Sequence, residues 1–186
     1  MELKELQEIC EKCQKCPLWK TKTKTVFGVG AQDADIMFIG EAPGENEDLT
    51  GVPFVGRAGQ LFDKYLEYLG ISRTNVYIAN ILKCRPPKNR DPQSDEQDAC
   101  IQYLREQVRI IDPKLIVCLG RISALRIIKP DYKITSEHGT FVKKGRYVMT
   151  AVYHPSALLR DPKKKDDMLK DMEKIKEYAV KHGLKI

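Results

Sequence analysis

Cysteine is the residue type whose number and spacing point most clearly to chemistry in this chain. Cys10, Cys13 and Cys16 recur at every third position, and Cys84, Cys100 and Cys118 follow far apart. In a reducing cytosol such cysteines are not expected to form structural disulfides. Their uneven clustering, with a Cys-x-x-Cys pair among charged residues, indicates ligation of a metal or a cofactor instead.

The spacing favours a metal but leaves zinc and an iron–sulfur cluster both open. Cys84 and Cys100 lie on different expected elements, which is unusual for a structural zinc site. Thiolates gathered in this way suit a cubane iron–sulfur cluster at least as well, and the Cys-Pro junction at Cys16 also recurs in iron–sulfur runs. Cys10 could replace a neighbouring ligand. Cys118 lies inside an apolar run and is expected to be a small buried hydrophobe.

Apolar runs alternate with helical patterns along the chain. Strands are expected at Ile36–Ile39, Val76–Ile81, Leu115–Leu119 and Tyr147–Tyr153, and helices at Ala58–Leu69, Ser94–Ile111, Gly120–Ile128 and Asp166–His182. This alternation predicts an α/β fold with a mostly parallel sheet. Ligands of such sheets bind beyond the carboxyl ends of the strands, where Gly40-Glu41, Asn80, Gly120 and His154 fall. One common site at that edge is therefore predicted.

The loops next to this edge carry residue types suited to binding or catalysis. Glu41 opens the acidic turn Gly40–Asp48, which is either a plain surface turn or the source of a functional carboxylate at a strand end. Phe54 lies between glycines and is either a core residue or a stacking platform for a planar ligand. His154 precedes a loop stiffened by proline, and this position favours a functional role over a structural one.

Two further segments suggest contact with a nucleic acid. Lys83–Arg90 holds four cations and no acid, and two prolines stiffen it. A charge run is usually a solvated face, but this one adjoins the predicted site, which favours contact with phosphates. Leu158 and Leu159, directly before Arg160, are unusual on an exposed loop and suggest a wedge into a base stack.

Length and composition set the remaining bounds. With 186 residues, of which 42% are hydrophobic, the chain can bury a sizeable core as one domain, and wholesale disorder is excluded. No apolar run approaches the length of a membrane span, and the charged N-terminus does not resemble a secretory signal, so we expect a cytoplasmic protein without a membrane partner. The net charge of +6 permits a polyanion partner, and the abundance of Lys and Glu fits a heat-adapted protein.

Four ordered motifs closely resemble those of the family 4 uracil-DNA glycosylases, the iron–sulfur branch of that superfamily found in thermophilic archaea and bacteria. They are GEAPGENED at Gly40–Asp48, GVPFVGRAG at Gly51–Gly59, NILKCRPPKNRDP at Asn80–Pro92, and HPSALLR at His154–Arg160. The cysteine spacing matches too, and the resemblance runs from about Cys13 to the C-terminal helix.

The resemblance implies a three-layer α/β/α sandwich around a four-stranded parallel sheet. Residues 1–186 are expected to form one glycosylase domain with an N-terminal iron–sulfur-binding segment. The implied cofactor is a structural [4Fe-4S] cluster held by Cys13, Cys16, Cys84 and Cys100, which leaves Cys10 and Cys118 free. The implied reaction flips deoxyuridine out of DNA and hydrolyses its N-glycosidic bond, releasing uracil and leaving an abasic site.

The resemblance also assigns roles to individual residues. Phe54 is expected to stack on uracil, and Asn80 to read the O4/N3–H edge that cytosine reverses. His154 is expected to stabilise the departing anion at O2, and Glu41 to orient water or stabilise the sugar cation. The expected sets are catalytic Glu41 and His154; uracil-binding Gly40, Ala42, Glu47, Phe54, Asn80 and His154; and DNA-binding Lys83, Arg85, Lys88, Arg90, Ser156, Leu158 and Arg160.

Two rival functions remain open on the sequence alone. One is a DNA-binding iron–sulfur module without turnover, and the other is a zinc-stabilised nucleotide-binding protein of another class. The expected partner is uracil-containing DNA, single- or double-stranded, and a sliding clamp is a further candidate partner that the residues leave open. The resemblance implies a monomer.

Overall fold

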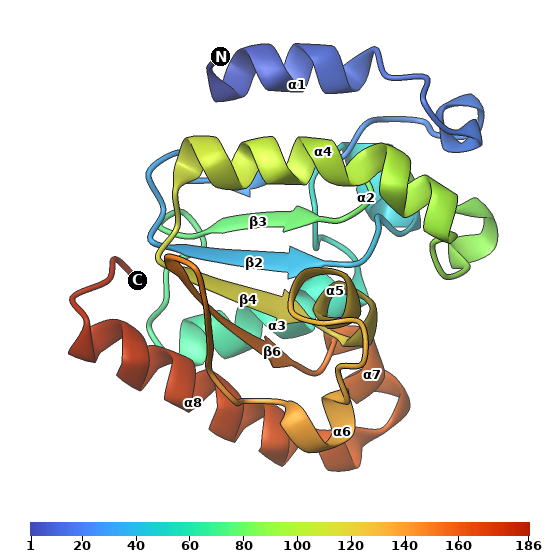
Figure 1. Cartoon of the computed structure of the whole chain (residues 1–186). Helices are drawn as coiled ribbons and strands as arrows, with labels where there is room; N and C mark the ends of the chain where they lie inside the picture. Colours follow the sequence, from blue (N-terminus) through green and yellow to red (C-terminus); the bar gives the residue numbers. More distant parts are fainter.

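Six strands form one mixed sheet in the computed structural model, which describes residues 1–186. The strand order is β1-β3-β2-β4-β6-β5. Figure 1 labels the four central strands β3, β2, β4 and β6. The strands are β1 (Val29–Gly30), β2 (Ile36–Gly40), β3 (Tyr77–Asn80), β4 (Leu115–Leu119), β5 (Val142–Lys144) and β6 (Tyr147–Val152). The central strands β3, β2, β4 and β6 pair in parallel, so their carboxyl ends lie at one edge, and they correspond to the strands that the sequence predicts.

The edge strands β1 and β5 are absent from the sequence prediction, which specifies a four-stranded parallel sheet. Both pair antiparallel with their neighbours. β1 has only 2 residues, and the 3 residues of β5 are all exposed and include two lysines. Neither segment is long or apolar enough to show the pattern of a buried strand. The sheet is therefore parallel at its centre and antiparallel at both edges.

Helices cover both faces of the sheet and complete a three-layer arrangement (Figure 1). One face carries α4 (Ser94–Ile111) and α5 (Arg121–Ile127), with α1 (Leu3–Glu11) packed against α4, and the other carries α3 (Arg57–Tyr68), α7 (Pro155–Arg160) and α8 (Lys165–Lys181). The short helices α2 (Glu45–Thr50) and α6 (Ile134–Glu137) lie in the connections. No helix has both the length and the apolar character needed to cross a membrane.

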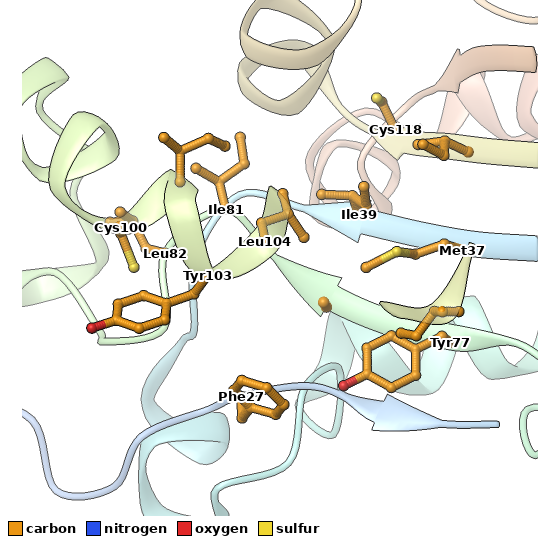
Figure 2. Close-up of a cluster of buried hydrophobic side chains, with 14 of the residues drawn as sticks. Phe27, Met37, Ile39, Tyr77, Ile81, Leu82, Cys100, Tyr103, Leu104 and Cys118 are labelled. Atoms are coloured by element: carbon orange, nitrogen blue, oxygen red, sulfur yellow. The ribbon is translucent and has the colours of Figure 1, made fainter. Parts of the chain in front are cut away.

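Each central strand is buried on both faces, which explains its continuous apolar sequence. Along β2, Met37 and Ile39 belong to the core beneath α4, where Leu104 also lies (Figure 2). Phe38 points to the opposite core, where its ring packs against that of Phe62 with centroids 5.1 Å apart. The two cores hold the strand ends rigidly, and the loops that follow those ends are positioned by them.

Candidate active site

The carboxyl ends of the central strands open into a cleft of about 470 Å³. Glu41 follows β2, Asn80 ends β3, and His154 follows β6, while Phe54 enters from the loop between α2 and α3. Their convergence places at one cleft the four residues that the sequence analysis assigns to chemistry and base binding. Of the other predicted site residues, Ala42, Glu47, Arg90, Ser156 and Arg160 also line the cleft.

Asn80 presents an unused hydrogen-bond acceptor at this cleft. The residue is only 2% exposed, and its side-chain Oδ1 has no hydrogen-bond partner in the folded chain. Gly40 pairs with Asn80 in the sheet, and a Cβ at Gly40 would collide with Oδ1 and come within 2.6 Å of the Phe54 ring. A buried acceptor without a partner is costly unless a ligand supplies the donor. The amide is therefore placed to receive one.

The side chain of Phe54 is both a core residue and part of the cleft wall. It is 5% exposed, and its ring centroid lies 5.7 Å from that of Phe62 and 5.6 Å from the His154 ring. Its backbone adopts the left-handed conformation with φ +53°, which is uncommon for a large residue and typical of functional loops. The two interpretations left open by the sequence therefore coexist in one side chain.

Arg73 fixes this unusual loop, and the sequence analysis does not select it as a site residue. Its guanidinium donates to the carbonyl oxygens of Pro53 and Phe54 and pairs with Asp63. Arg73 lies in the connection before β3, nearly twenty positions from the loop that it holds, so no local motif identifies it. The arginine acts on the cleft only through the position of Phe54.

His154 caps the first turn of α7 with its own side chain. The backbone N–H of Ser156 donates to Nδ1 at 3.1 Å, and the Ser156 hydroxyl lies 2.7 Å from the same nitrogen. Nδ1 is therefore an acceptor, so the neutral ring carries its proton on Nε2. Burial lowers the pKa of His154 to about 4, and the charge of Arg160 contributes in the same direction. The imidazole is thus a neutral Nε2–H donor at physiological pH.

Close backbone packing brings the imidazole to this position. Gly120, at the end of β4, has φ +95°, and a Cβ there would lie 2.7 Å from the Cβ of His154. Only glycine combines that left-handed conformation with the absence of a side chain. Gly120 is therefore required by the neighbouring histidine, and the sequence analysis rightly places both residues at strand ends.

Glu41 is half-buried beside the carboxylate of Asp91, which also lines the cleft. Burial, joined by the negative charge of Asp91, raises the pKa of Glu41 to about 7, although the charges of Arg121 and Arg160 oppose the shift. Protonated and ionised forms of Glu41 are therefore both populated near neutral pH. Asp91 is a cleft residue that the sequence analysis does not select, because its motif is assigned there to phosphate binding.

Glu47 ties together the two loops that form the cleft wall. Its Oε1 accepts from the backbone N–H groups of Val55 at 2.9 Å and Gly56 at 2.8 Å. Its Oε2 accepts from the N–H of Gly44 at 3.2 Å. A carboxylate held by three backbone donors is fixed in place, so Glu47 sets the spacing between the acidic turn and the Phe54 loop.

Lys83 does not lie on the surface, and its predicted contact with DNA is wrong. The residue is 1% exposed, and its ammonium donates to the main-chain oxygen of Asn80 at 2.9 Å and to Oε1 of Gln107 at 2.6 Å. A lysine enclosed in this way has no path to a phosphate. The run of cations at Lys83–Arg90 gives a wrong prediction for Lys83, because the exposure of the side chains changes from one residue to the next.

The other cations of this loop have different surroundings. Lys88 is exposed, and Arg85 donates from Nε to the side chain of Asn89 at 2.8 Å. Arg90 forms a two-pronged ion pair with the buried Glu96, at 2.9 and 2.6 Å. Arg90 therefore fastens the loop to the start of α4, whereas Lys88 leaves its charge in solvent.

Leu158 is also misassigned by the sequence, because residues 155–160 form helix α7 rather than a loop. Successive residues of a helix point in different directions. Leu158 is 0% exposed and packs in the core with α3 and α8, whereas Leu159 is 41% exposed. The wedge predicted for this pair can come only from Leu159, and Arg160 beside it is exposed at the cleft.

Five of the six cysteines line a second, small cavity between the N-terminal segment, the loop after β3 and α4. They are Cys10, Cys13, Cys16, Cys84 and Cys100, and we call this the cysteine cavity. None of the cysteines forms a disulfide, and no three His, Cys, Asp or Glu side chains surround a single metal position. Cys118 is 0% exposed on β4, away from Cys100 (Figure 2), as expected for a buried hydrophobe.

The chemistry of the cysteine cavity is that of a soft, all-sulfur donor set. No carboxylate lines it. Burial raises the pKa of Cys84 to about 12 and also raises that of Cys100, while the Lys83 ammonium acts against the rise at Cys100. The backbone N–H of Lys83 donates to Sγ of Cys100 at 3.3 Å. Thiols of this kind suit an iron–sulfur cluster or zinc, since bound metal keeps thiolates ionised despite burial.

Comparison with known proteins gives a consistent result. Residues 27–176 match the model of the uracil DNA glycosylase superfamily. The type-4 uracil-DNA glycosylase of Archaeoglobus fulgidus is 45% identical over 174 residues, which cover 88% of this chain and 86% of that protein. The type-4 enzyme of Thermotoga maritima is 44% identical over 172 residues, covering 90% and 89%, respectively. A type-5 uracil-DNA glycosylase of Pyrobaculum aerophilum is 33% identical over 146 residues, covering 69% and 64%. This chain therefore belongs to the uracil-DNA glycosylase superfamily and, within it, to the type-4 family.

Proposed function

We propose that this chain removes uracil from DNA by hydrolysing the N-glycosidic bond of a flipped deoxyuridine. The observation that carries the proposal is the buried, unpartnered Oδ1 of Asn80 beside the Phe54 ring. N3–H of uracil would donate to this oxygen, and the side-chain NH₂ of Asn80 would donate to O4. Cytosine has an acceptor at N3 and an amino donor at C4, the reverse of uracil. Its edge would therefore leave both the oxygen and the NH₂ group of Asn80 without a partner.

Two residues would supply the chemistry of bond cleavage. As the bond from C1′ to N1 breaks, negative charge spreads over the uracil ring, and Nε2–H of His154 would donate to O2. The deoxyribose acquires positive charge at the same time. An ionised Glu41 would either take a proton from the water that attacks C1′ or stabilise the sugar cation directly. The hydroxyl of that water joins C1′, and the uracil anion is protonated after departure.

The cleft walls would decide which pyrimidine enters. Phe54 would stack on the flipped ring, because its position is fixed by the core on one side and by Arg73 on the other. Glu47 holds the acidic turn against the Phe54 loop through three backbone N–H groups. A wall fastened in this way resists displacement, and we assign it the exclusion of the additional methyl group of thymine.

The rim of the cleft would hold the DNA backbone. Arg85, Lys88 and Arg160 are the cations that we assign to phosphates, with Leu159 filling the gap that the flipped base leaves. Ser156 contacts His154 through its hydroxyl and therefore positions the imidazole besides lining the rim. All of these residues come from one chain, and we propose that the protein acts on DNA as a monomer in the cytoplasm.

The cysteine cavity would hold a [4Fe-4S] cluster through Cys13, Cys16, Cys84 and Cys100. Support comes from the cysteines that line the cavity without any carboxylate and from the N–H group that donates to a cysteine sulfur. The cluster would supply a structural cross-link, joining the N-terminal segment to the loop after β3. The bond cleavage described above uses only residues of the other cavity.

A single-turnover assay on a uracil-containing oligonucleotide tests the proposed activity. The wild-type protein should convert the uracil site into an alkali-labile abasic site, whereas a DNA-binding module without turnover would give no such product at high protein concentration. Asn80→Asp should weaken discrimination and raise activity on cytosine, because the carboxyl changes the hydrogen-bonding edge. Asn75→Asp, in the turn before β3, is the matched control and should discriminate as the wild type does. Wild-type discrimination by Asn80→Asp would overturn the assignment of base reading.

A further inference from the structure

Lys83 is a buried cation without a carboxylate partner. Its side chain is enclosed, and the two acceptors of its ammonium, the Asn80 carbonyl and Oε1 of Gln107, are both neutral. None of the ion pairs in the chain includes Lys83. A buried charge is destabilising unless an opposite charge lies nearby. No carboxylate of this protein supplies the opposite charge that would stabilise the Lys83 ammonium.

The surroundings of Gln107 hold the ammonium in place. Gln107 is 0% exposed, and its side-chain Nε2 donates to the carbonyl of Phe27 at 2.9 Å and to the hydroxyl of Tyr77 at 3.2 Å. With the NH₂ group occupied, Oε1 is directed toward Lys83. The ammonium also lies 5.8 Å from the centre of the Phe27 ring, which Figure 2 shows in the same part of the core as Tyr77.

The cysteine cavity adjoins Lys83, and a cluster bound there would bring negative charge to it. Lys83 is among its lining residues, directly precedes Cys84 and donates its backbone N–H to Cys100. Four thiolate ligands outweigh the charge of a cubane iron–sulfur core, so a bound cluster is anionic. The cavity would then contain the anion that Lys83 lacks.

We propose that Lys83 is the internal counter-cation of the iron–sulfur cluster and the link between that cluster and Asn80. The inference rests on the cluster assigned under the proposed function. One end of the lysine is fixed by the chain segment that carries the cluster ligand Cys84, and the other end holds the main-chain carbonyl of Asn80. Lys83 is a positioning residue, because it touches neither the base nor the reacting bond. Lys83 thereby couples the occupancy of the cysteine cavity to the position of Asn80 at the end of β3.

The midpoint potential of the cluster tests this role in the anaerobically purified holoenzyme. Lys83→Met removes the buried charge at similar length and should move the potential to a more negative value, because an anionic cluster accepts an electron less readily without a nearby cation. Lys181→Met makes the same change in net charge at an exposed site on α8 and should leave the potential unchanged. Lys83→Met should also lower the excision rate, since the Asn80 carbonyl loses its donor. An unchanged potential in Lys83→Met would overturn the proposal.

A second variant decides the matter if Lys83→Met loses its cluster. Gln107→Glu leaves the lysine in place and sets a carboxylate against its ammonium, so the potential should again become more negative. An unchanged potential in a cluster-loaded Gln107→Glu protein contradicts the inference. So does a colourless wild-type protein that contains zinc, even if it excises uracil. If the wild-type protein does not excise uracil but the two variants show the expected shifts in potential, only the proposed function is contradicted.

Discussion

The two titratable groups at the centre of the cleft, Glu41 and His154, have pKa values shifted in opposite directions by the same cause. Burial disfavours the charged form of each, so the pKa of the glutamate rises to about 7 and that of the histidine falls to about 4. The histidine is therefore neutral over the whole range in which the glutamate titrates. Such a pair gives one residue that changes its protonation near neutral pH and one that does not.

The pH dependence of excision follows from this pair. The proposed role of Glu41 needs the ionised carboxylate, so kcat/KM should rise with pH and level off above an apparent pKa near 7. Glu41→Gln should lower the rate by about 10²- to 10⁴-fold and abolish this rise, because the amide does not titrate. His154 should add no second step between pH 5 and pH 8, since its pKa is about 4. Single-turnover rates across this range check the prediction, and a rise that persists in Glu41→Gln would assign it to another group.

At the scale of elements, the sequence predicts what is long and periodic and misses what depends on single contacts. The helix at Ser94–Ile111 has the predicted bounds, and α3, α5 and α8 begin and end within one residue of the prediction. Their apolar stripes indicate these helices, and residues such as Gly70 and Pro113 mark where they end. Helix α7 has only 6 residues, and its first turn depends on a cap from the His154 side chain, which no periodicity reveals. Because the sequence does not predict α7, it does not predict the burial of Leu158 either.

The residues of the candidate site show the same difference between features that the sequence predicts and features that depend on single distant contacts. Glu41, Asn80 and His154 were predictable because the carboxyl ends of parallel strands must meet at one edge. The gathering of Cys13, Cys16, Cys84 and Cys100 at one cavity was predictable from residue type and spacing. Lys83 was not, because its burial depends on Gln107 in α4, 24 positions away, which supplies a buried acceptor. Arg73 likewise acts on a loop that is distant in the sequence.

The two leucines of α7 give a matched test of this element. Leu158→Ala should reduce the free energy of unfolding by about 2–5 kcal/mol, since it leaves a cavity in the core. Leu159→Ala should change that free energy by less than about 0.5 kcal/mol, because the side chain is exposed. It should instead slow excision from duplex DNA more than from single strands, since only a duplex leaves a gap in a base stack. Denaturant titration and the two substrates separate the effects, and equal slowing on both substrates would contradict a wedge.

At the scale of the whole molecule, the net charge of +6 is modest, so its distribution matters more than its sum. Many of the cations are engaged by acids: Arg90 by Glu96, Arg126 by Asp98 and Lys114 by Asp35. Lys88, at the tip of the loop beside the cleft, takes part in none of the ion pairs. A DNA strand that enters the cleft would therefore meet Lys88 as an uncompensated charge.

The salt dependence of DNA binding measures this contact. Each phosphate neutralised by a cation contributes about 0.9 to the slope of log K against log salt concentration, because condensed counterions are released. Lys88→Ala should therefore reduce the slope by about 1 on an oligonucleotide without uracil, where binding is measured apart from excision. Lys181→Ala removes the same charge from the end of α8 and should leave the slope unchanged. An equal reduction in both variants would mean that the protein responds to DNA through its total charge, and the basic loop would then lose its assigned place on the phosphate backbone.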